Sequence, residues 1–439
     1  MATLAWDDFM GGGGLISEEY DKIDMYPTLM SILFESNNFL GSIPAGPGAK
    51  NIEFQHLEDD IVPNYVTAQI TIAAGALTQL DFLAADYTQE ELDAILRQGT
   101  GVAPEALYLQ EPNGDWTIKH DGTGQLILGA ADGQESEFAV VAGALPTTLA
   151  QTKLDLFVAL PKDDFTDASP DIPRERDLRR GFTRVFERTV RIGETRKHIE
   201  MYGVSDETAH QIEKITRTVQ NELAGAVIRD HVRVTGTPPK TLTDKGQRLM
   251  TGLLQQIRDP LLSGTLDAGT AIATGAPSSN LIFNAAAATT WNQVYRDGLN
   301  DLIYAMDKTG ALDAPGADHY IWCHPLQRRL FSHYDASLRR AGYESRKAGY
   351  TVEAILTDMG REFGIMTDWH FPTNMILVLD MNRILRRDVP GDGWNMEQMA
   401  KTGRSDKWQL SGQFGCSVMN VGKSHGIIKN IGTGLTLPT

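Results

Sequence analysis

A single long amphipathic helix is the feature that most constrains this chain. Along residues 205–232 apolar side chains recur at spacings of three and four, as a helix with one buried face requires: Ile212, Ile215, Val219, Leu223 and Ala226. Ser205 is predicted to cap this helix, and Gly236 and Pro238-Pro239 prevent its continuation. At about 1.5 Å per residue it forms a rod of ~40 Å. The sequence therefore predicts one backbone element with a separate α/β region after it.

The region before the helix has a different residue pattern, with short β-type runs separated by glycines. These runs are residues 68–72, 116–120, 125–128 and 137–141. One helix is predicted among them at 88–96, with Thr88 as its cap and Glu91 completing a capping box. An acidic stretch at 163–171 follows the last run. This pattern predicts a small β-rich domain inserted into a longer excursion of the chain.

The remaining segments complete an α+β pattern. Residues 1–50 combine a glycine run with a Gly/Pro-rich end, which suits an arm lying over a neighbour. Strands are predicted at 51–58, 181–192, 320–324, 351–356 and 375–380, and helices at 290–307 and 326–331, the second opened by Pro325. The run at 375–380 is almost entirely apolar, as in a strand buried on both faces.

Length and cysteine content limit the class of protein. A chain of 439 residues is predicted to form two or three cores rather than one. Cys323 and Cys416 are too few for a disulfide framework, which favours buried thiols in a reducing compartment. The N-terminus lacks a signal-peptide pattern, and no apolar stretch approaches the ~20 residues that cross a bilayer. We therefore expect a soluble protein made in the cytosol, without a membrane partner.

Charge is unevenly distributed along the chain. The formal net charge of -17 opposes binding to a phosphate backbone. Residues 174–197, however, contain nine Lys or Arg against four Asp or Glu. This stretch could face nucleic acid, form a plain solvated strand, or make an inter-subunit surface of charge pairs, which we favour. Exposed ion pairs contribute only about 0–1 kcal/mol each, but repetition in a symmetric assembly lets them fix register.

Motifs for catalysis and cofactor binding are incomplete. Residues 422–426 match the G-x-S-x-G pattern around Ser424, but the segment after them is β-like and no acid or further His follows, so a turn before the last strand is predicted. Ser417 stands where a phosphate loop needs glycine. No His or Cys spacing indicates zinc, and the acidic stretch 163–171 lacks the order of a calcium loop. We expect no enzymatic activity, catalytic residue, metal or cofactor.

The order of elements resembles the major capsid proteins of tailed bacteriophages with the Hong Kong 97-type (Johnson) fold, in the branch with a β-rich domain inserted in the E-loop. Three segments carry the likeness. Residues 56–63 look like the entry to the excursion, residues 184–195 resemble the segment that leads into the spine helix, and residues 399–414, followed by Asn420 and His425-Gly426, are similar to the C-terminal signature.

The resemblance implies a specific division of the chain. It would place an N-terminal arm at 1–50, an E-loop region at 51–200 with the inserted domain at about 66–162, a spine helix of the peripheral domain at 201–240, an axial domain at 241–375, and returning C-terminal strands at 376–439. It also implies self-assembly into pentamers and hexamers of an icosahedral head around double-stranded DNA. The portal, a scaffold and a decoration protein would be partners, and DNA would be contacted non-specifically.

An extended hairpin cannot bury its faces within one subunit, so we expect it to lie on a neighbour. Its acidic end is predicted to meet the basic strand of another subunit; the candidates for these inter-subunit contacts are Glu58, Asp59, Asp60, Arg184, Arg188 and Arg191. The implied location is the virion capsid, after synthesis in the host bacterial cytoplasm. Two other classes stay open: a secreted or tail-associated β-rich adhesion protein, and a hydrolase.

Overall fold

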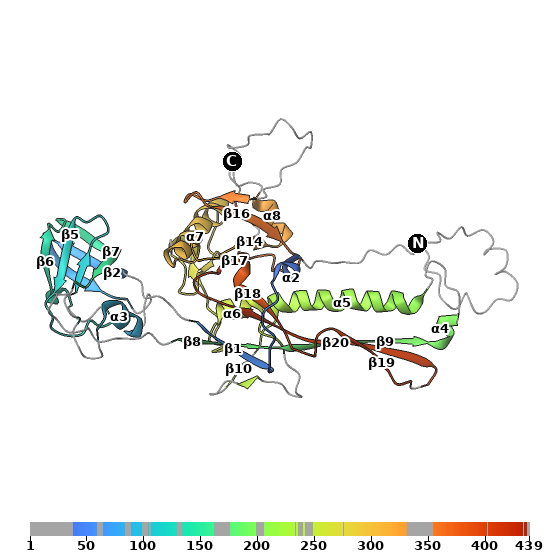
Figure 1. Ribbon diagram of the computed structural model, residues 1–439. Coiled ribbons are helices and arrows are strands. Elements are labelled where there is room, and N and C mark those ends of the chain that lie inside the picture. Colours follow the sequence, from blue (N-terminus) through green and yellow to red (C-terminus); the bar gives the residue numbers. More distant parts are fainter. Residues whose placement is uncertain are drawn as a thin grey trace.

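The computed structural model describes residues 38–58, 65–83, 89–98, 104, 107–129, 134–161, 176–198, 206–232, 234–235, 240–241, 249–274, 276–331, 354–401, 403–432 and 434–436. The molecule is elongated (Figure 1). A β-rich lobe lies at one end, a mixed α/β body in the middle, and a long helix with long strands at the other end. Helices and strands are mixed throughout the chain, so the α+β class predicted from the sequence is confirmed.

The central sheet explains the apolar run at 375–380. Its seven strands, in spatial order, are β12 (Thr270–Ala271), β13 (Ile282–Asn284), β21 (Gly426–Lys429), β17 (Ile376–Asp380), β14 (His319–Cys323), β16 (Glu362–Thr367) and β15 (Ala354–Leu356). Every residue of β17 is buried. Ile376 and Val378 pack in one hydrophobic cluster with the helix α7 (Gly298–Lys308), whereas Leu377 and Leu379 pack in a second with α5 (Glu207–Arg229). Because β17 lies between two hydrophobic cores, apolar side chains are required on both of its faces.

The helices predicted beside this sheet are present. α8 (Pro325–Phe331) follows β14 and has Pro325 at its first position, as predicted. The predicted helix at 290–307 begins as a π-helical segment, η4 (Gln293–Asp297), and continues as α7. The short elements of the described chain are η2 (Gln134–Glu137), η3 (Ile272–Thr274), η5 (Met381–Arg383) and the hairpin of β10 (Val234–Thr235) with β11 (Lys240–Thr241).

A second sheet forms the long end of the molecule. Its central strand, β20 (Ser405–Val418), pairs antiparallel with β9 (Arg184–Gly193), β18 (Ile384–Asp388) and β19 (Asn395–Met399). A short helix, α4 (Glu194–His198), follows β9. α5 runs alongside β9 and β20 (Figure 1) and contacts both. The helix is the backbone element that the sequence predicted, and the second sheet lies along it.

The boundaries of α5 differ slightly from the prediction. Asp206, and not Ser205, occupies the cap position, because its carboxylate accepts hydrogen bonds from the backbone N–H of Thr208 at 2.8 Å and of Ala209 at 3.3 Å. Ser205 itself lies outside the described residues. The helix ends at Arg229, three residues before the predicted end, since Asp230 has an extended backbone. Val219, Leu223 and Ala226 of the predicted face are buried, and so are Ala224, Val227 and Ile228, so the last turns of the helix are covered on more than one side.

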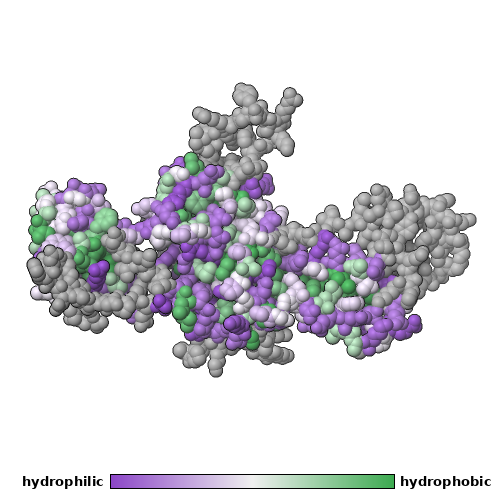
Figure 2. All heavy atoms as spheres, in the orientation of Figure 1, coloured by the Kyte–Doolittle hydropathy of each residue, from purple (hydrophilic) through white to green (hydrophobic). Residues whose placement is uncertain are grey.

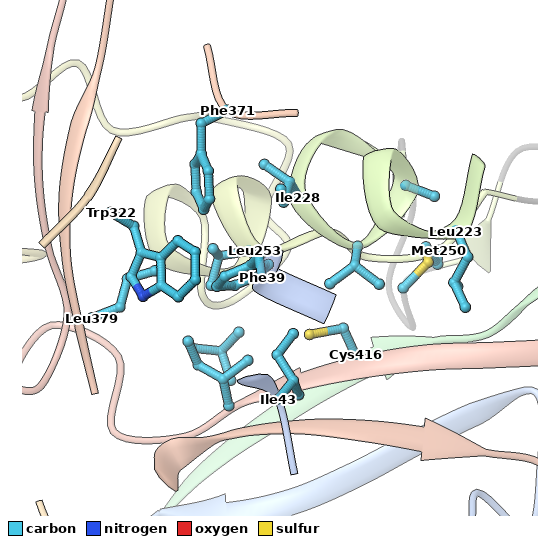
Figure 3. Packing of buried hydrophobic residues seen from close by; sticks show 14 of the residues in the cluster. Phe39, Ile43, Leu223, Ile228, Met250, Leu253, Trp322, Phe371, Leu379 and Cys416 are labelled. Atoms are coloured by element: carbon cyan, nitrogen blue, oxygen red, sulfur yellow. The ribbon is translucent and has the colours of Figure 1, made fainter. Parts of the chain in front are cut away.

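The segment predicted as an arm over a neighbour is, in its described part, packed into its own subunit. α2 (Asn38–Ser42) inserts Phe39 between Trp322 and Phe371 (Figure 3), with ring centroids 5.0 and 5.1 Å away and the rings nearly perpendicular. The N–H of Phe39 donates to the buried carboxylate of Asp368 at 3.1 Å. Phe39 and Ile43 therefore belong to the hydrophobic core of their own subunit; the arm over a neighbour stays a prediction, and residues 1–37 lie outside the described residues.

The lobe is a six-stranded sheet with its own hydrophobic core. In spatial order its strands are β3 (Ala76–Asp81), β2 (Tyr65–Ala73), β7 (Thr148–Ala159), β4 (Tyr108–Gln110), β5 (Trp116–His120) and β6 (Phe138–Gly143), and one helix, α3 (Gln89–Leu96), packs against it. Three of the four predicted β runs are confirmed. The predicted run at 125–128 is not a strand, because the side chains of Gln89 and Gln98 bind its backbone groups in place of a neighbouring strand.

Both cysteines are buried, as predicted. Burial raises the pKa of Cys323 and of Cys416 to about 12, so neither thiol ionises at neutral pH. Among the described helices, none combines the length and the apolar character needed to span a membrane.

Gln256 joins the second sheet to the helix α6 (Leu253–Arg258). Its side-chain amide donates to the carbonyls of Thr251 and Cys416 at 2.8 Å each, and its oxygen accepts from the N–H of Val418 at 3.0 Å. We expect Gln256→Leu to lower the free energy of unfolding by about 1–3 kcal/mol, because a buried N–H loses its acceptor. Urea unfolding of the subunit measures this. Gln398→Leu, on the exposed strand β19, should change it by less than about 0.5 kcal/mol; equal effects would contradict the prediction.

Candidate functional site

The base of the lobe is connected to the body by a two-stranded ribbon. β1 (Glu53–Glu58) pairs antiparallel with β8 (Asp177–Phe182), from Glu53 opposite Phe182 to Glu58 opposite Asp177. At one end Phe182 is 4% exposed, whereas Leu57 and Leu178, which face each other across the ribbon, are 60% and 38% exposed. An isolated pair of strands is at best marginally stable. The ribbon therefore presents an apolar cross-strand pair that the described residues of this subunit leave exposed.

Glu58 lies at the lobe end of the ribbon and is held by its own chain. Its carboxylate pairs with Arg179 at 3.0 Å and with His56 at 3.3 Å, and also accepts a hydrogen bond from the N–H of Asn420. Burial alone would raise the pKa of Glu58, but the hydrogen bonds from His56 and Arg179 outweigh it and hold the pKa below its ordinary value. Glu58 therefore stays ionised at neutral pH.

Ion pairs join the basic strand β9 to α5. The guanidinium of Arg184 donates to Glu222 at 2.6 Å and to Asp230 at 2.9 Å, and Arg188 reaches the other oxygen of Glu222 at 3.0 Å. Arg191 donates to the hydroxyl of Ser405 on β20 at 2.9 Å. Phe186, Val190 and Ile192 of β9 are buried, whereas Arg188 is exposed. These contacts fix the helix on the sheet, so part of the positive charge of β9 is neutralised within the subunit.

The predicted inter-subunit contacts stay predictions, since one subunit is described. Asp59 and Asp60 lie outside the described residues. Arg188 is 53% exposed at its side chain and thus keeps surface available to a neighbour, while Arg184 is only 22% exposed. Sequence reasoning missed the partners within the subunit: Arg179 pairs with Glu58 on the ribbon, and Glu222 and Asp230 pair with Arg184 of β9. The strand register and the helix packing that create these pairs leave no local signal in the sequence.

The G-x-S-x-G segment is a turn that enters β21, as predicted. Ser424 is 1% exposed and His425 is fully buried. The imidazole of His425 is engaged at both nitrogens: Nδ1 accepts from the N–H of Asp380 at 3.3 Å, and Nε2 lies 3.0 Å from the carbonyl of Met419. His425 therefore links β17 to the turn after β20. Within the described residues, no three His, Cys, Asp or Glu side chains are grouped to hold a metal ion.

The burial of His425 makes stability depend on pH. Burial lowers the pKa of His425 from 6.5 to about 4, against the opposing influence of Asp380. Because the unfolded chain binds this proton more tightly, stability is fully present above pH 6.5 and is lost as pH falls toward 4. We expect a loss of about 3 kcal/mol over this window. Urea unfolding of the His425→Gln subunit at several pH values should show a flatter dependence than the wild type; an unchanged slope would contradict this.

The family model for the SU10 major capsid protein matches residues 14–432. Among curated proteins, no sequence matches this chain. Solved structures with a similar chain include the capsid of an empty GTA particle, at 12% identity and TM-score 0.47, covering 95% of this chain and 98% of that one.

Two phage structures are also similar. Mycobacterium phage Bobi has 10% identity and TM-score 0.42, with 94% of this chain and 96% of that chain covered. The capsid of Myoviridae phage XM1 has 9% identity and TM-score 0.43, with 96% of this chain and 100% of that chain covered.

Proposed function

This chain belongs to the SU10 major capsid protein family, and we propose that it assembles into pentamers and hexamers of an icosahedral phage head that encloses double-stranded DNA. The family is one of structural capsid proteins, and the family match over residues 14–432 is the observation that carries the proposal. Its elements are those of a Hong Kong 97-type capsid subunit, with α5 as the spine helix and the β1–β8 ribbon as the base of the E-loop.

The proposed division of the chain follows these elements. The E-loop region spans 51–200 and carries the lobe, the spine helix lies within 201–240, and the axial domain spans 241–375. The strands of 376–439 return to both sheets, with β21 in the central sheet and β20 in the second one. The exposed Leu57 and Leu178 support this assignment, because a ribbon of this kind is completed by a neighbouring subunit.

Function and partners follow from the same proposal. The subunit performs no catalysis: its work is to bind copies of itself, and a portal, a scaffold and a decoration protein complete the particle. Contact with the packaged DNA is non-specific, since a net charge of -17 opposes tight binding to a phosphate backbone. Synthesis and assembly take place in the host bacterial cytoplasm, and the final location is the virion capsid.

Sedimentation velocity of the purified chain tests the proposal. We expect species of five or six subunits, or much larger closed shells, in a distribution that shifts with salt because charge pairs contribute to the contacts. A single species with the mass of 48.3 kDa at high concentration and at every salt concentration would overturn it.

A further inference from the structure

The outer edge of the lobe is an exposed apolar strand. Among the described strands, β6 pairs only with β5, so no described strand binds the backbone groups of its other edge. Val140 and Val141 are 46% and 51% exposed, and no charged residue occurs from 138 to 152. Figure 2 shows hydrophobic atoms at this end of the lobe. Proteins normally protect such edges with charge, proline or a cover. An exposed edge without these features is a docking surface for another strand.

A second exposed edge lies at the opposite end of the molecule (Figure 1). In the described part of the chain, β19 pairs only with β20, and all five of its residues are exposed. Met396 and Met399 are each 42% exposed, and Trp394 just before the strand is 40% exposed. The turn that follows carries Lys401 and Arg404, whose side chains are 52% and 86% exposed. The strand mixes its two methionines with Asn395, Glu397 and Gln398. The turn at its end is basic, and there Lys401 pairs with Glu194 and Asp406, and Arg404 with Glu194, in their own subunit.

The two ends have opposite charge. The lobe, residues 65–161, contains 13 Asp or Glu and three Lys or Arg. The other end, residues 184–198 and 395–407, contains eight Lys or Arg and four Asp or Glu. Two lobes would repel each other, whereas a lobe and the end that carries β19 attract. Because these surfaces lie at opposite ends of one chain, each can meet the other only in a second copy.

We propose that β6 of one subunit docks on β19 of a neighbouring copy and adds a strand to its sheet. The contact is head-to-tail, the kind that closes rings. A six-residue strand buries much less than the ~800 Å² per partner of a stable binary complex, so this contact suits a partner already held nearby in a shell. The inference rests on the proposed function, since it names one contact within that shell.

Charge sets the direction of the two strands. Glu135 and Glu137 precede β6, and Lys401 and Arg404 follow β19. An antiparallel arrangement brings these four side chains together, with Phe138 opposite Met399 and Val141 opposite Met396. Opposite residues of antiparallel strands have Cα atoms about 4.5–5.5 Å apart, which lies within the range that a disulfide bridges.

Disulfide trapping tests the contact. Shells of the full chain carrying Val141→Cys and Met396→Cys are oxidised and run on a non-reducing gel. We expect a ladder of covalently linked subunits, which reduction abolishes; both native cysteines are buried and do not interfere. Leu261→Cys with Met396→Cys is the control, because Leu261 is 63% exposed but lies outside both edges. Ala139→Cys should link to Gln398→Cys and not to Asn395→Cys if the strands are antiparallel.

Charge reversal gives an independent readout. Glu135→Lys with Glu137→Lys should weaken shell assembly at low salt, and Lys401→Glu with Arg404→Glu in the same chain should restore it. Shells that form normally but give no ladder beyond the control would overturn this inference and leave the proposed function standing. A wild-type chain that forms neither rings nor shells would overturn the proposed function itself. Linking of residue 139 to 395 would overturn the antiparallel direction.

Discussion

Replacing Phe39 with alanine is expected to lower the free energy of unfolding of the subunit by about 3–5 kcal/mol. Phe39 is fully buried, and its ring packs nearly perpendicular to the rings of Trp322 and Phe371. The substitution leaves a cavity between three elements that are distant in sequence, because α2 bridges the helix α5 and the central sheet. Urea unfolding of the subunit, followed by tryptophan fluorescence, measures the loss.

A matched control separates burial from the loss of an aromatic ring. Tyr304 lies on α7 and is 61% exposed. Tyr304→Ala should cost less than about 1 kcal/mol, since most surface substitutions away from special features have small effects. If Phe39→Ala were as mild as this control, residues 38–49 would not belong to the core of their own subunit.

Assembly should fail when the exposed face of the ribbon is made acidic. Leu57→Asp with Leu178→Asp changes a cross-strand pair that is 60% and 38% exposed in the free subunit. Covering one leucine contributes about 1.5–3 kcal/mol, so the double variant is expected to raise the concentration needed for assembly by roughly 100-fold or more. The subunit should stay folded, because neither side chain enters its core. Light scattering measures assembly, and circular dichroism measures folding.

Leu261→Asp provides the comparison for this variant. Leu261 is 63% exposed and lies in the turn after α6, outside β1 and β8. Shells should form from Leu261→Asp at close to the wild-type concentration. Normal assembly of the ribbon variant would show that no neighbour covers Leu57 and Leu178, and would remove the main physical support for the proposed E-loop contact.

Local patterns predicted the regular elements well. The uninterrupted apolar run of β17 and the proline that opens α8 are recognisable from neighbouring residues alone, and both are confirmed. The cap of α5 was placed one residue early because Ser205 and Asp206 are both good capping residues, and only the backbone geometry distinguishes them. The strand predicted at 125–128 was wrong because long-range glutamine side chains bind its backbone, an alternative that alternation of residue types does not reveal.

Local sequence patterns could not predict the contacts between segments that are distant in sequence. The sequence drew attention to Arg184 and Arg188 by their density of charge, but their partner Glu222 lies on a helix more than 30 residues away and depends on how α5 packs on β9. In the same way, Phe39 looked like part of a loose arm, since its neighbours in sequence are rich in glycine and proline. Its place in the core depends on a gap between Trp322 and Phe371 that only the tertiary structure creates.

Negative-stain electron microscopy of the purified, full-length chain tests the central claim most directly. The proposed shell-forming role predicts rings of five or six subunits, or closed particles with icosahedral outlines, under conditions in which the Leu57→Asp and Leu178→Asp variant yields neither. Fields of isolated, elongated subunits from the wild-type chain at high concentration, across a range of salt, would contradict the claim that this protein builds a capsid shell from copies of itself.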